Sequence, residues 1–293
     1  MTGKAELVCD AKAVLGEGPC WDSEKQLLYW VNIEKKKVCI FDPAASENRE
    51  IQLEERVSAI VPRTSGGAVI TLENGFYFLD LETEKISRIS EPEIHLTNNR
   101  FNDGKCDSKG RFWAGTMDKS DNKEQGALYC LDTDLRTIKK WDKLSLSNGL
   151  AWSPDNKFFY LIDTPTKKVL RFDFHIFTGG IENPVEIIDF QEEQGMPDGM
   201  TIDDEGMLWI AHWGGSKVSR WNPQTGKQVS SIEVPALNVT SCTFGGKDLS
   251  ELYITTARDG MSDEQLAKYP LSGGLFKVKT GVKGLPAYTF NDK

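Results

Sequence analysis

The sequence predicts an all-β fold, a six-bladed β-propeller, from a repeat that recurs along the chain. Each repeat opens with a small polar or acidic residue that leads into an apolar strand, and successive openings are 41, 44, 46, 50 and 43 residues apart. Periods of this length indicate solenoids, propellers or other repeat arrays. Each period holds three or four short strands with turns between them and no room for a helix, which favours a propeller. The opening residues are Glu17, Ser58, Asn102, Asn148, Asp198 and Ser241.

Three of the six units show the expected strands in most detail. Clusters of Asp, Asn, Ser, Pro and Gly mark turns at 22–25, 153–156, 203–206 and 222–226. The apolar runs between these turns predict strands at 27–31 and 38–41 in the first unit, 158–162 and 169–172 in the fourth, and 207–211 and 217–221 in the fifth.

Near its C-terminus the chain is expected to form a short helix and to close the ring of blades. Residues 263–268 are expected to form one or two helical turns. A strand at 5–8 is expected to pair with the last unit, around 275–278 and 287–290, and so seal the circle. Because no linker, charge block or low-complexity stretch interrupts the repeat, residues 1–293 are expected to form a single domain.

Composition excludes several classes of function. The formal net charge is −9, which argues against a nucleic-acid partner because such binding relies on Lys and Arg. No run of eighteen apolar residues occurs, so a membrane role is not expected. The chain starts without an apolar run of signal-peptide length, and its six cysteines form no C-x-x-C pair. We therefore expect a cytoplasmic monomer with reduced, buried cysteines.

The opening residues predict a cation site. In a propeller the first strand of each unit lines the central channel, so equivalent residues converge at its mouth. Glu17, Asn102, Asn148 and Asp198 would then supply two carboxylates and two carboxamides, the oxygen donors that suit Ca²⁺, Mg²⁺ or Mn²⁺. An Asn or Asp before Gly is by itself an ordinary turn former, but Glu is a poor turn residue. The joint occurrence at repeat-equivalent positions favours a divalent ion.

Most of the other histidine, tryptophan and charged side chains that stand out in the sequence are expected to have structural roles. His212 lies at a strand end that could reach the channel mouth, but packing is the favoured role. Trp213 is the tryptophan expected to overhang the pocket. Arg258 with Asp259 forms either a bracing ion pair or a piece of the rim, and the brace is the preferred interpretation. The tryptophans expected to pack between blades are Trp21, Trp30, Trp113, Trp152, Trp209 and Trp221.

Several ordered segments carry a resemblance to a known family. They are Leu-Gly-Glu-Gly-Pro at 15–19, Asn-Arg-Phe-Asn-Asp-Gly at 99–104, Trp-Ala-Gly-Thr-Met-Asp at 113–118, Ser-Asn-Gly-Leu-Ala-Trp at 147–152 and Pro-Asp-Gly-Met-Thr-Ile at 197–202. On these segments the chain resembles the SMP-30/gluconolactonase/regucalcin-like family of six-bladed, metal-dependent lactonases. The resemblance implies that Glu17, Asn148 and Asp198 hold one divalent ion (Ca, Mg, Mn or Zn) and that Arg100 and Asn102 contact the substrate.

The resemblance also implies a reaction. A sugar lactone would be hydrolysed to the aldonic acid, with the ion as Lewis acid and Asp198 as general base. Relatives often place an acidic residue on a lid loop after Gly-Thr-Met, and Ser120 falls about there in this chain. The stretch 118–124 is shorter than in animal relatives, which leaves the identity of the lactone open.

Three alternatives remain beside the lactonase. A phosphotriesterase could use the same site, although Arg100 and a polar lid suit a polyol better than an apolar phosphotriester. A calcium-binding regulatory protein would need a tight Ca²⁺ site, whereas two carboxylates with open positions favour a substrate. A WD40-like or kelch-like interaction propeller lacks its signatures here and would not need Glu17 at the channel mouth.

Overall fold

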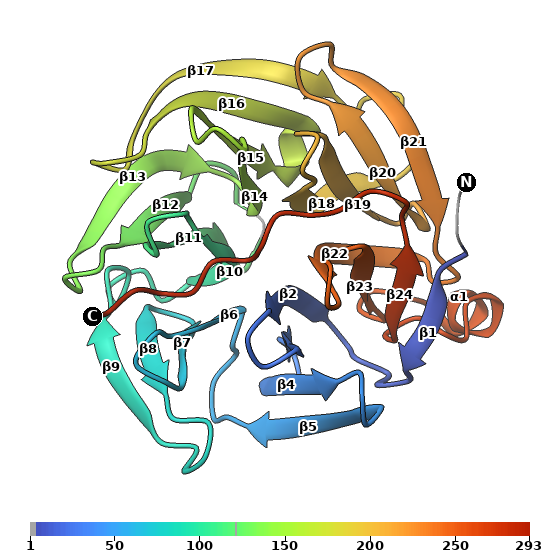
Figure 1. Cartoon of the computed structure of the whole chain (residues 1–293), viewed down its shortest axis with the longest axis horizontal. Helices are drawn as coiled ribbons and strands as arrows, with labels where there is room; N and C mark the ends of the chain where they lie inside the picture. Colours follow the sequence, from blue (N-terminus) through green and yellow to red (C-terminus); the bar gives the residue numbers. More distant parts are fainter. Residues whose placement is uncertain (1–3, 121) are drawn as a thin grey trace.

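Six four-stranded antiparallel sheets stand around a central channel in the computed structural model of the chain, which describes residues 4–120 and 122–293. Figure 1 looks down this channel and shows the sheets as blades of a propeller, with the first strand of each blade innermost. The predicted six-bladed β-propeller is therefore confirmed.

The first three blades follow the chain in order. Each blade runs from an inner strand at the channel to an outer strand at the rim. Their strands are β2 (Gly16–Asp22), β3 (Leu27–Asn32), β4 (Lys37–Asp42) and β5 (Glu47–Gln52); β6 (Ala59–Pro62), β7 (Ala68–Thr71), β8 (Phe76–Leu79) and β9 (Ile86–Ser90); and β10 (Asn99–Cys106), β11 (Phe112–Asp118), β12 (Gly126–Leu131) and β13 (Thr137–Leu144).

The last three blades complete the ring. A 3₁₀ turn, η1 (Thr164–Thr166), follows β15, and the predicted helix is present as α1 (Asp263–Lys268) with a Ser262–Gln265 capping box. The strands are β14 (Ser147–Trp152), β15 (Phe158–Asp163), β16 (Lys168–His175) and β17 (Gly180–Asp189); β18 (Met196–Ile202), β19 (Leu208–Trp213), β20 (Lys217–Asn222) and β21 (Lys227–Glu233); and β22 (Asn238–Gly245), β23 (Glu251–Ala257), β24 (Leu275–Lys279) and β1 (Glu6–Cys9). Neither helix among the described residues has the length and apolar character that a membrane span requires.

The N-terminal strand closes the circle. β1 pairs antiparallel with β24 and is the outer strand of the last blade, so the two ends of the repeat share one sheet. This pairing confirms the expected closure between 5–8 and 275–278. The expected contribution of 287–290 is wrong, because Phe290 pairs with Arg63 beside the second blade instead.

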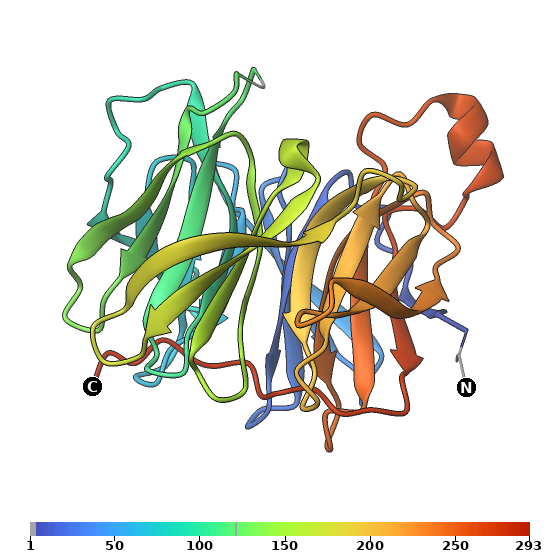
Figure 2. The ribbon, with the colours of Figure 1, turned by 90° about the horizontal axis from the view of Figure 1, so that it is seen from above.

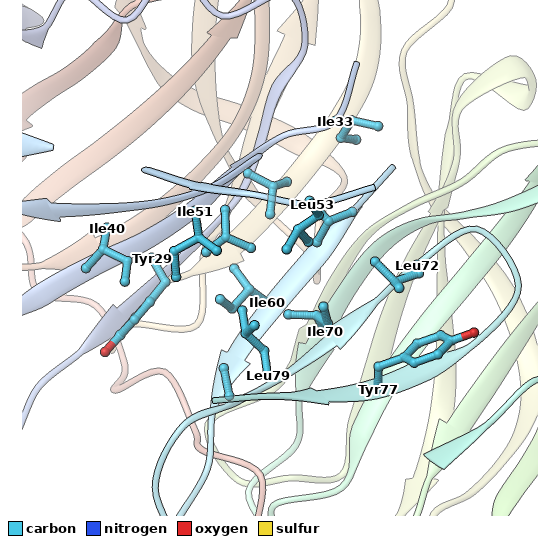
Figure 3. Packing of buried hydrophobic residues seen from close by; sticks show 14 of the residues in the cluster. Tyr29, Ile33, Ile40, Ile51, Leu53, Ile60, Ile70, Leu72, Tyr77 and Leu79 are labelled. Atoms are coloured by element: carbon cyan, nitrogen blue, oxygen red, sulfur yellow. The ribbon is translucent and has the colours of Figure 1, made fainter. Parts of the chain in front are cut away.

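Apolar side chains fill each of the six contacts between neighbouring blades. Figure 3 shows the cluster between the first two blades, where Tyr29 and Ile51 face Ile60 and Ile70. The cluster between the last and first blades contains Trp21, which stacks on the ring of Tyr253 at a centroid distance of 5.4 Å. The six tryptophans expected to pack between blades are all buried.

The turn between the first two strands of several blades is held by one acidic or hydroxyl side chain. Asp107 and Asp203 are fully buried, and each accepts backbone N–H groups of its own turn. Each also accepts the indole N–H of the tryptophan six residues later, at 2.8 and 2.9 Å. Arg111 and Arg220 complete these networks as ion pairs of 2.7 Å. The buried carboxylate of each turn thus has hydrogen-bond and ion-pair partners, and these contacts stabilise the interior of the blade.

The C-terminal segment covers one end of the channel. It crosses that face from β24 towards the second and third blades (Figure 1), and Figure 2 shows it on the side opposite α1. Gly284 pairs with Asp203, the backbone of Asn291 bonds to Gly110, and Asp292 pairs with Arg63 at 2.6 Å. The other end of the channel is therefore the end available to a ligand.

We predict that Asp203→Asn lowers the free energy of unfolding by about 3 kcal/mol, because it leaves Arg220 without its buried partner. The amide also turns one acceptor into a donor that faces an indole N–H. Urea unfolding followed by far-UV circular dichroism measures the change. Asp204→Asn, at the exposed neighbouring position, is the matched control and should change stability by no more than ~0.5 kcal/mol. Equal stabilities of the two variants would refute this role of Asp203.

Candidate active site at the open end of the channel

A cavity of about 400 Å³ occupies the open end of the channel. Its volume lies within the usual range for small-molecule sites. Five of the residues predicted from the sequence line it together: Glu17, Arg100, Asn102, Asn148 and Asp198. The inner strands β2, β10, β14 and β18 supply all five side chains, so the convergence expected from the repeat is present.

Irregular pairing accompanies these residues on their strands. The register between the first and second strands of a blade shifts at Glu17 to Cys20, Phe101 to Gly104, Asn148 to Leu150 and Pro197 to Met200. Such bulges re-aim side chains and are frequent beside active sites. The second blade has a regular register between β6 and β7 and contributes no inner-strand residue to the cavity.

The glycine after each of two site residues is required by close packing of the inner strands. A Cβ atom at Gly149 would lie 2.7 Å from the carbonyl oxygen of Asp198, and one at Gly199 would lie 2.1 Å from the Ser241 hydroxyl. Neither contact is possible for a larger residue without movement of the strand. The Asn-Gly and Asp-Gly pairs therefore serve strand packing as well as the turn role that their sequence suggests.

Three buried carboxylates lie near one another in this part of the channel. Glu17, Asp103 and Asp198 each expose less than a tenth of their surface. Burial is the main cause that raises the pKa of all three, and the pKa values of Glu17 and Asp198 rise further because each faces other negative charges. Backbone N–H groups and Arg100 offset only part of this effect on Glu17. Unscreened carboxylates in such a place favour a bound cation.

Arg100 and Asn102 form a hydrogen bond with each other. Arg100 donates from Nη1 to the Asn102 side-chain oxygen at 2.8 Å and to the carbonyl oxygen of Phe101 at 2.9 Å. Asn102 in turn donates from its amide nitrogen to the carbonyl oxygen of Ser147 at 3.0 Å. Among the described residues this guanidinium donates hydrogen bonds from Nη1 alone, which leaves the N–H groups of Nη2 and Nε for a ligand.

Asn148 is oriented by a residue that the sequence did not single out. Its amide nitrogen donates to the Thr164 hydroxyl at 3.1 Å, and that hydroxyl donates to the carbonyl oxygen of Pro197 at 2.8 Å. The amide oxygen of Asn148 thereby points away from Thr164, and it accepts a hydrogen bond from the backbone N–H of Gly149 at 3.3 Å. Thr164 lies in η1, outside the repeat-equivalent positions, which is why the repeat did not point to it.

The donor set fits a hard divalent cation. Among residues 4–120 and 122–293, no three His, Cys, Asp or Glu side chains are close enough together to hold a metal ion by themselves. An ion here would therefore need the amide oxygen of Asn148 beside the carboxylates of Glu17 and Asp198. Oxygen donors of mixed charge are typical of Ca²⁺, Mg²⁺ and Mn²⁺.

Ser120 lies apart from this group. It is exposed, does not line the cavity, and accepts a hydrogen bond from Asn98 at 3.1 Å. Asn98 also holds Asp118, whose carboxylate binds the backbone of Ser120. The lid stretch 118–124 includes residue 121, which lies outside the described residues. Contact between Ser120 and a substrate stays a prediction.

Trp213 and Asp259, for which the sequence also suggested roles, are among the other residues that line the cavity. Trp213 does so as expected. Asp259 also lines it, and no salt bridge between Arg258 and Asp259 is present among the described residues. The preferred interpretation of this pair as a brace is therefore wrong, and the alternative, in which Asp259 belongs to the rim, is correct. The loop after β23 places it there, and no repeat position marks that loop.

Known proteins resemble this chain over almost its full length. A family model described as "SMP-30/Gluconolactonase/LRE-like region" matches residues 15–258. The Bacillus subtilis (strain 168) protein YvrE, described as a candidate sugar lactone lactonase, is 41% identical over 286 residues, with 98% of each chain covered. Regucalcin of Gallus gallus is 41% identical over 293 residues, again with 98% of each covered.

Solved structures show the same architecture. The structure of a calcium-binding protein, regucalcin, from Agrobacterium tumefaciens (strain C58) superposes with a TM-score of 0.93 and 27% identity. The alignment covers 99% of this chain and 97% of the other. Likeness of this extent includes every inner strand of the propeller.

His212 has the packing role that was expected. It is fully buried, its ring contacts Phe190, and its nitrogens bond to the Ser219 hydroxyl at 2.6 Å and to the carbonyl oxygen of Gln194 at 3.0 Å. Burial lowers its pKa from 6.5 to about 4, since the charged ring would lose hydration. The folded protein therefore holds His212 neutral at physiological pH.

A pH dependence of stability follows from this shift. The unfolded chain binds the proton below pH 6.5, whereas the folded chain binds it only near pH 4, so stability is full above pH 6.5 and falls between these values. We predict that the stability difference between the unaltered protein and His212→Gln shrinks by about 3 kcal/mol from pH 7 to pH 4. Urea unfolding at both pH values measures it, and a difference independent of pH would exclude the buried neutral ring.

Proposed function

Because the chain belongs to the SMP-30/gluconolactonase/LRE-like family, we propose that it is a sugar lactonase that hydrolyses aldonolactones to aldonic acids with the help of one divalent ion. The observation that carries the proposal is the convergence of Glu17, Asn148 and Asp198 with Arg100 in one cavity. These three oxygen donors would hold the ion. When bound, the ion supplies Lewis acidity to the lactone carbonyl and stabilises the charge that develops on its oxygen.

Asp198 is the proposed general base. Its carboxylate lies in the cavity, and the nearby Asn148 side chain and Gly199 backbone N–H lower its pKa, which offsets part of the rise that burial causes. It would take a proton from the attacking water as the water oxygen bonds to the carbonyl carbon. The bond between that carbon and the ring oxygen then breaks, and the proton passes to the ring oxygen, which leaves as a hydroxyl group. No oxidant or further reactant is needed.

Arg100 and Asn102 would position the substrate. Asn102 fixes the guanidinium through its side-chain oxygen, and the free Nη2 and Nε atoms can donate to hydroxyl groups or to the ring oxygen of a sugar. Ser120 is the proposed lid contact. Because the guanidinium is mostly buried, its hydrogen bonds to a ligand would be poorly screened and correspondingly strong.

The cavity supports a polyol substrate over the alternative classes. A phosphotriesterase would favour a wide apolar pocket, whereas this cavity sets Glu17, Arg100, Asn102, Asn148 and Asp198 among its apolar side chains and so offers partners to several hydroxyl groups. A calcium-binding regulatory role is kept as the second candidate, because a solved relative is described as a calcium-binding protein. We further propose a single domain over residues 1–293 that works as a cytoplasmic monomer.

The proposed activity is tested by a pH-indicator assay with aldono-1,4- and 1,5-lactones. Protein stripped of metal should be nearly inactive, and titration with Ca²⁺, Mg²⁺, Mn²⁺ or Zn²⁺ should restore turnover, because an unneutralised site would repel the developing oxyanion. Metal binding is measured in parallel by calorimetry. Tight Ca²⁺ binding without turnover on any lactone would favour the regulatory alternative instead.

Asp198→Asn tests the base. We predict that kcat falls by a factor on the order of 10² or more while the protein stays folded, because the amide cannot accept the proton from water. The exposed Asp142→Asn is the matched control and should keep full turnover. Stopped-flow hydrolysis of glucono-1,5-lactone at saturating metal gives the rates. Retained activity in Asp198→Asn would remove Asp198 as the base.

A further inference from the structure

A second cavity adjoins the candidate active site. It has a volume of about 300 Å³ and shares two wall residues, Trp213 and Asp259, with the first cavity. Its other walls come from the loop after β23, from the start of β22 and from α1. This cavity is thus next to the place where a lactone would bind, on the same open face of the propeller.

Two glycines without close neighbours border this cavity. A Cβ atom built at Gly214 or at Gly260 would meet no atom within 4 Å. Both glycines have positive φ angles, of 75° and 68°, so other residues would be strained there. The two loops that carry these glycines therefore leave the cavity beside Trp213 and Asp259 open to a ligand.

A buried amide offers an acceptor to this space. Asn238 exposes 5% of its surface and lines the second cavity. Its amide nitrogen donates to the carbonyl oxygen of Asp259 at 3.0 Å, which fixes the amide plane. Within the described part of the chain its Oδ1 accepts no hydrogen bond, so this oxygen is available to accept one from a ligand in the cavity.

The remaining groups of the wall complete a mixed lining. Gln265 bonds to Ser262 through its Oε1, so its amide nitrogen is available as a donor. Trp213 is only half-buried and offers an aromatic face. Leu237 and Met261 add apolar surface. An aromatic face with amides and a carboxylate around it suits a pyranose ring, which has apolar C–H faces and hydroxyl groups at its edge.

An alkyl chain would fit the same space poorly. It would cover the carboxylate of Asp259 and the open acceptor of Asn238 without giving either a hydrogen bond, and such desolvation is unfavourable. The hydroxyl groups of a sugar can donate hydrogen bonds to the Asp259 carboxylate and to the side-chain oxygen of Asn238. The polar groups of the wall therefore discriminate between two substituents of similar size.

We propose that this second cavity is a subsite for a glycosyl substituent, so that the protein also accepts lactones derived from disaccharides. The lactone ring occupies the first cavity and the attached sugar rests on Trp213 and bonds to Asn238 and Asp259. This inference rests on the proposed lactonase activity, which it extends to a larger substrate class.

The test compares kcat/KM for glucono-1,5-lactone with that for cellobiono-1,5-lactone and melibiono-1,5-lactone, whose sugars are attached at different positions. We expect turnover of at least one disaccharide lactone. In Met261→Trp, the added ring fills the second cavity and should lower the ratio of disaccharide to monosaccharide kcat/KM by about tenfold. Val229→Trp, on the exposed outer strand β21, adds the same ring elsewhere and should leave the ratio unchanged.

The outcomes separate this inference from the proposal beneath it. Hydrolysis of glucono-1,5-lactone without hydrolysis of either disaccharide lactone would overturn the subsite and leave the lactonase intact. An unchanged ratio in a folded Met261→Trp would overturn it as well. Absence of turnover with all three lactones in the metal-loaded protein would overturn both.

Discussion

The structure depends on the burial of three carboxylates at one end of a closed ring of strands. Glu17, Asp103 and Asp198 lie close enough for their charges to interact. Arg100 offsets the charges of Glu17 and Asp198, and Lys105 offsets that of Asp103. Burial of unpaired charge is costly, so such a group persists only where the fold holds it rigidly and a counter-charge is available. Bulged inner strands provide the rigidity, because they fix the backbone at each site residue.

Much of this arrangement could be predicted from the sequence, because in a propeller the spacing of the repeats determines which residues lie at the central axis. Equivalent positions of the repeat necessarily meet at the axis, so Glu17, Asn148 and Asp198 could be grouped without knowledge of any contact. Thr164 and Asp259 could not, since they lie on connections whose paths the repeat does not fix. The C-terminal segment was misplaced for the same reason: a chain without periodic pattern carries no signal of the face that it crosses.

The two ends of the channel have different roles, because the C-terminal segment covers only one of them. The C-terminal segment covers one end and ties blades that are distant in sequence, for example through the ion pair of Arg63 with Asp292. The other end is framed by loops that lie outside the repeat, including η1 and the loop that carries Asp259. The residues that would hold the ion and position the lactone ring therefore come from the inner strands, whereas residues that would contact other parts of a substrate, such as Asp259, come from these loops. Such a division lets substrate preference vary while the charged centre stays constant.

Anomalous diffraction from crystals soaked with Mn²⁺ tests the central claim most directly, because it locates the ion without reference to turnover. We predict one strong anomalous peak in the cavity, within bonding distance of side-chain oxygens of Glu17, Asn148 and Asp198. A map without a peak in the cavity, from crystals that show Mn²⁺ bound elsewhere, would contradict it. The buried carboxylates would then have to be neutralised by protons, and a metal-assisted reaction at this site would be untenable.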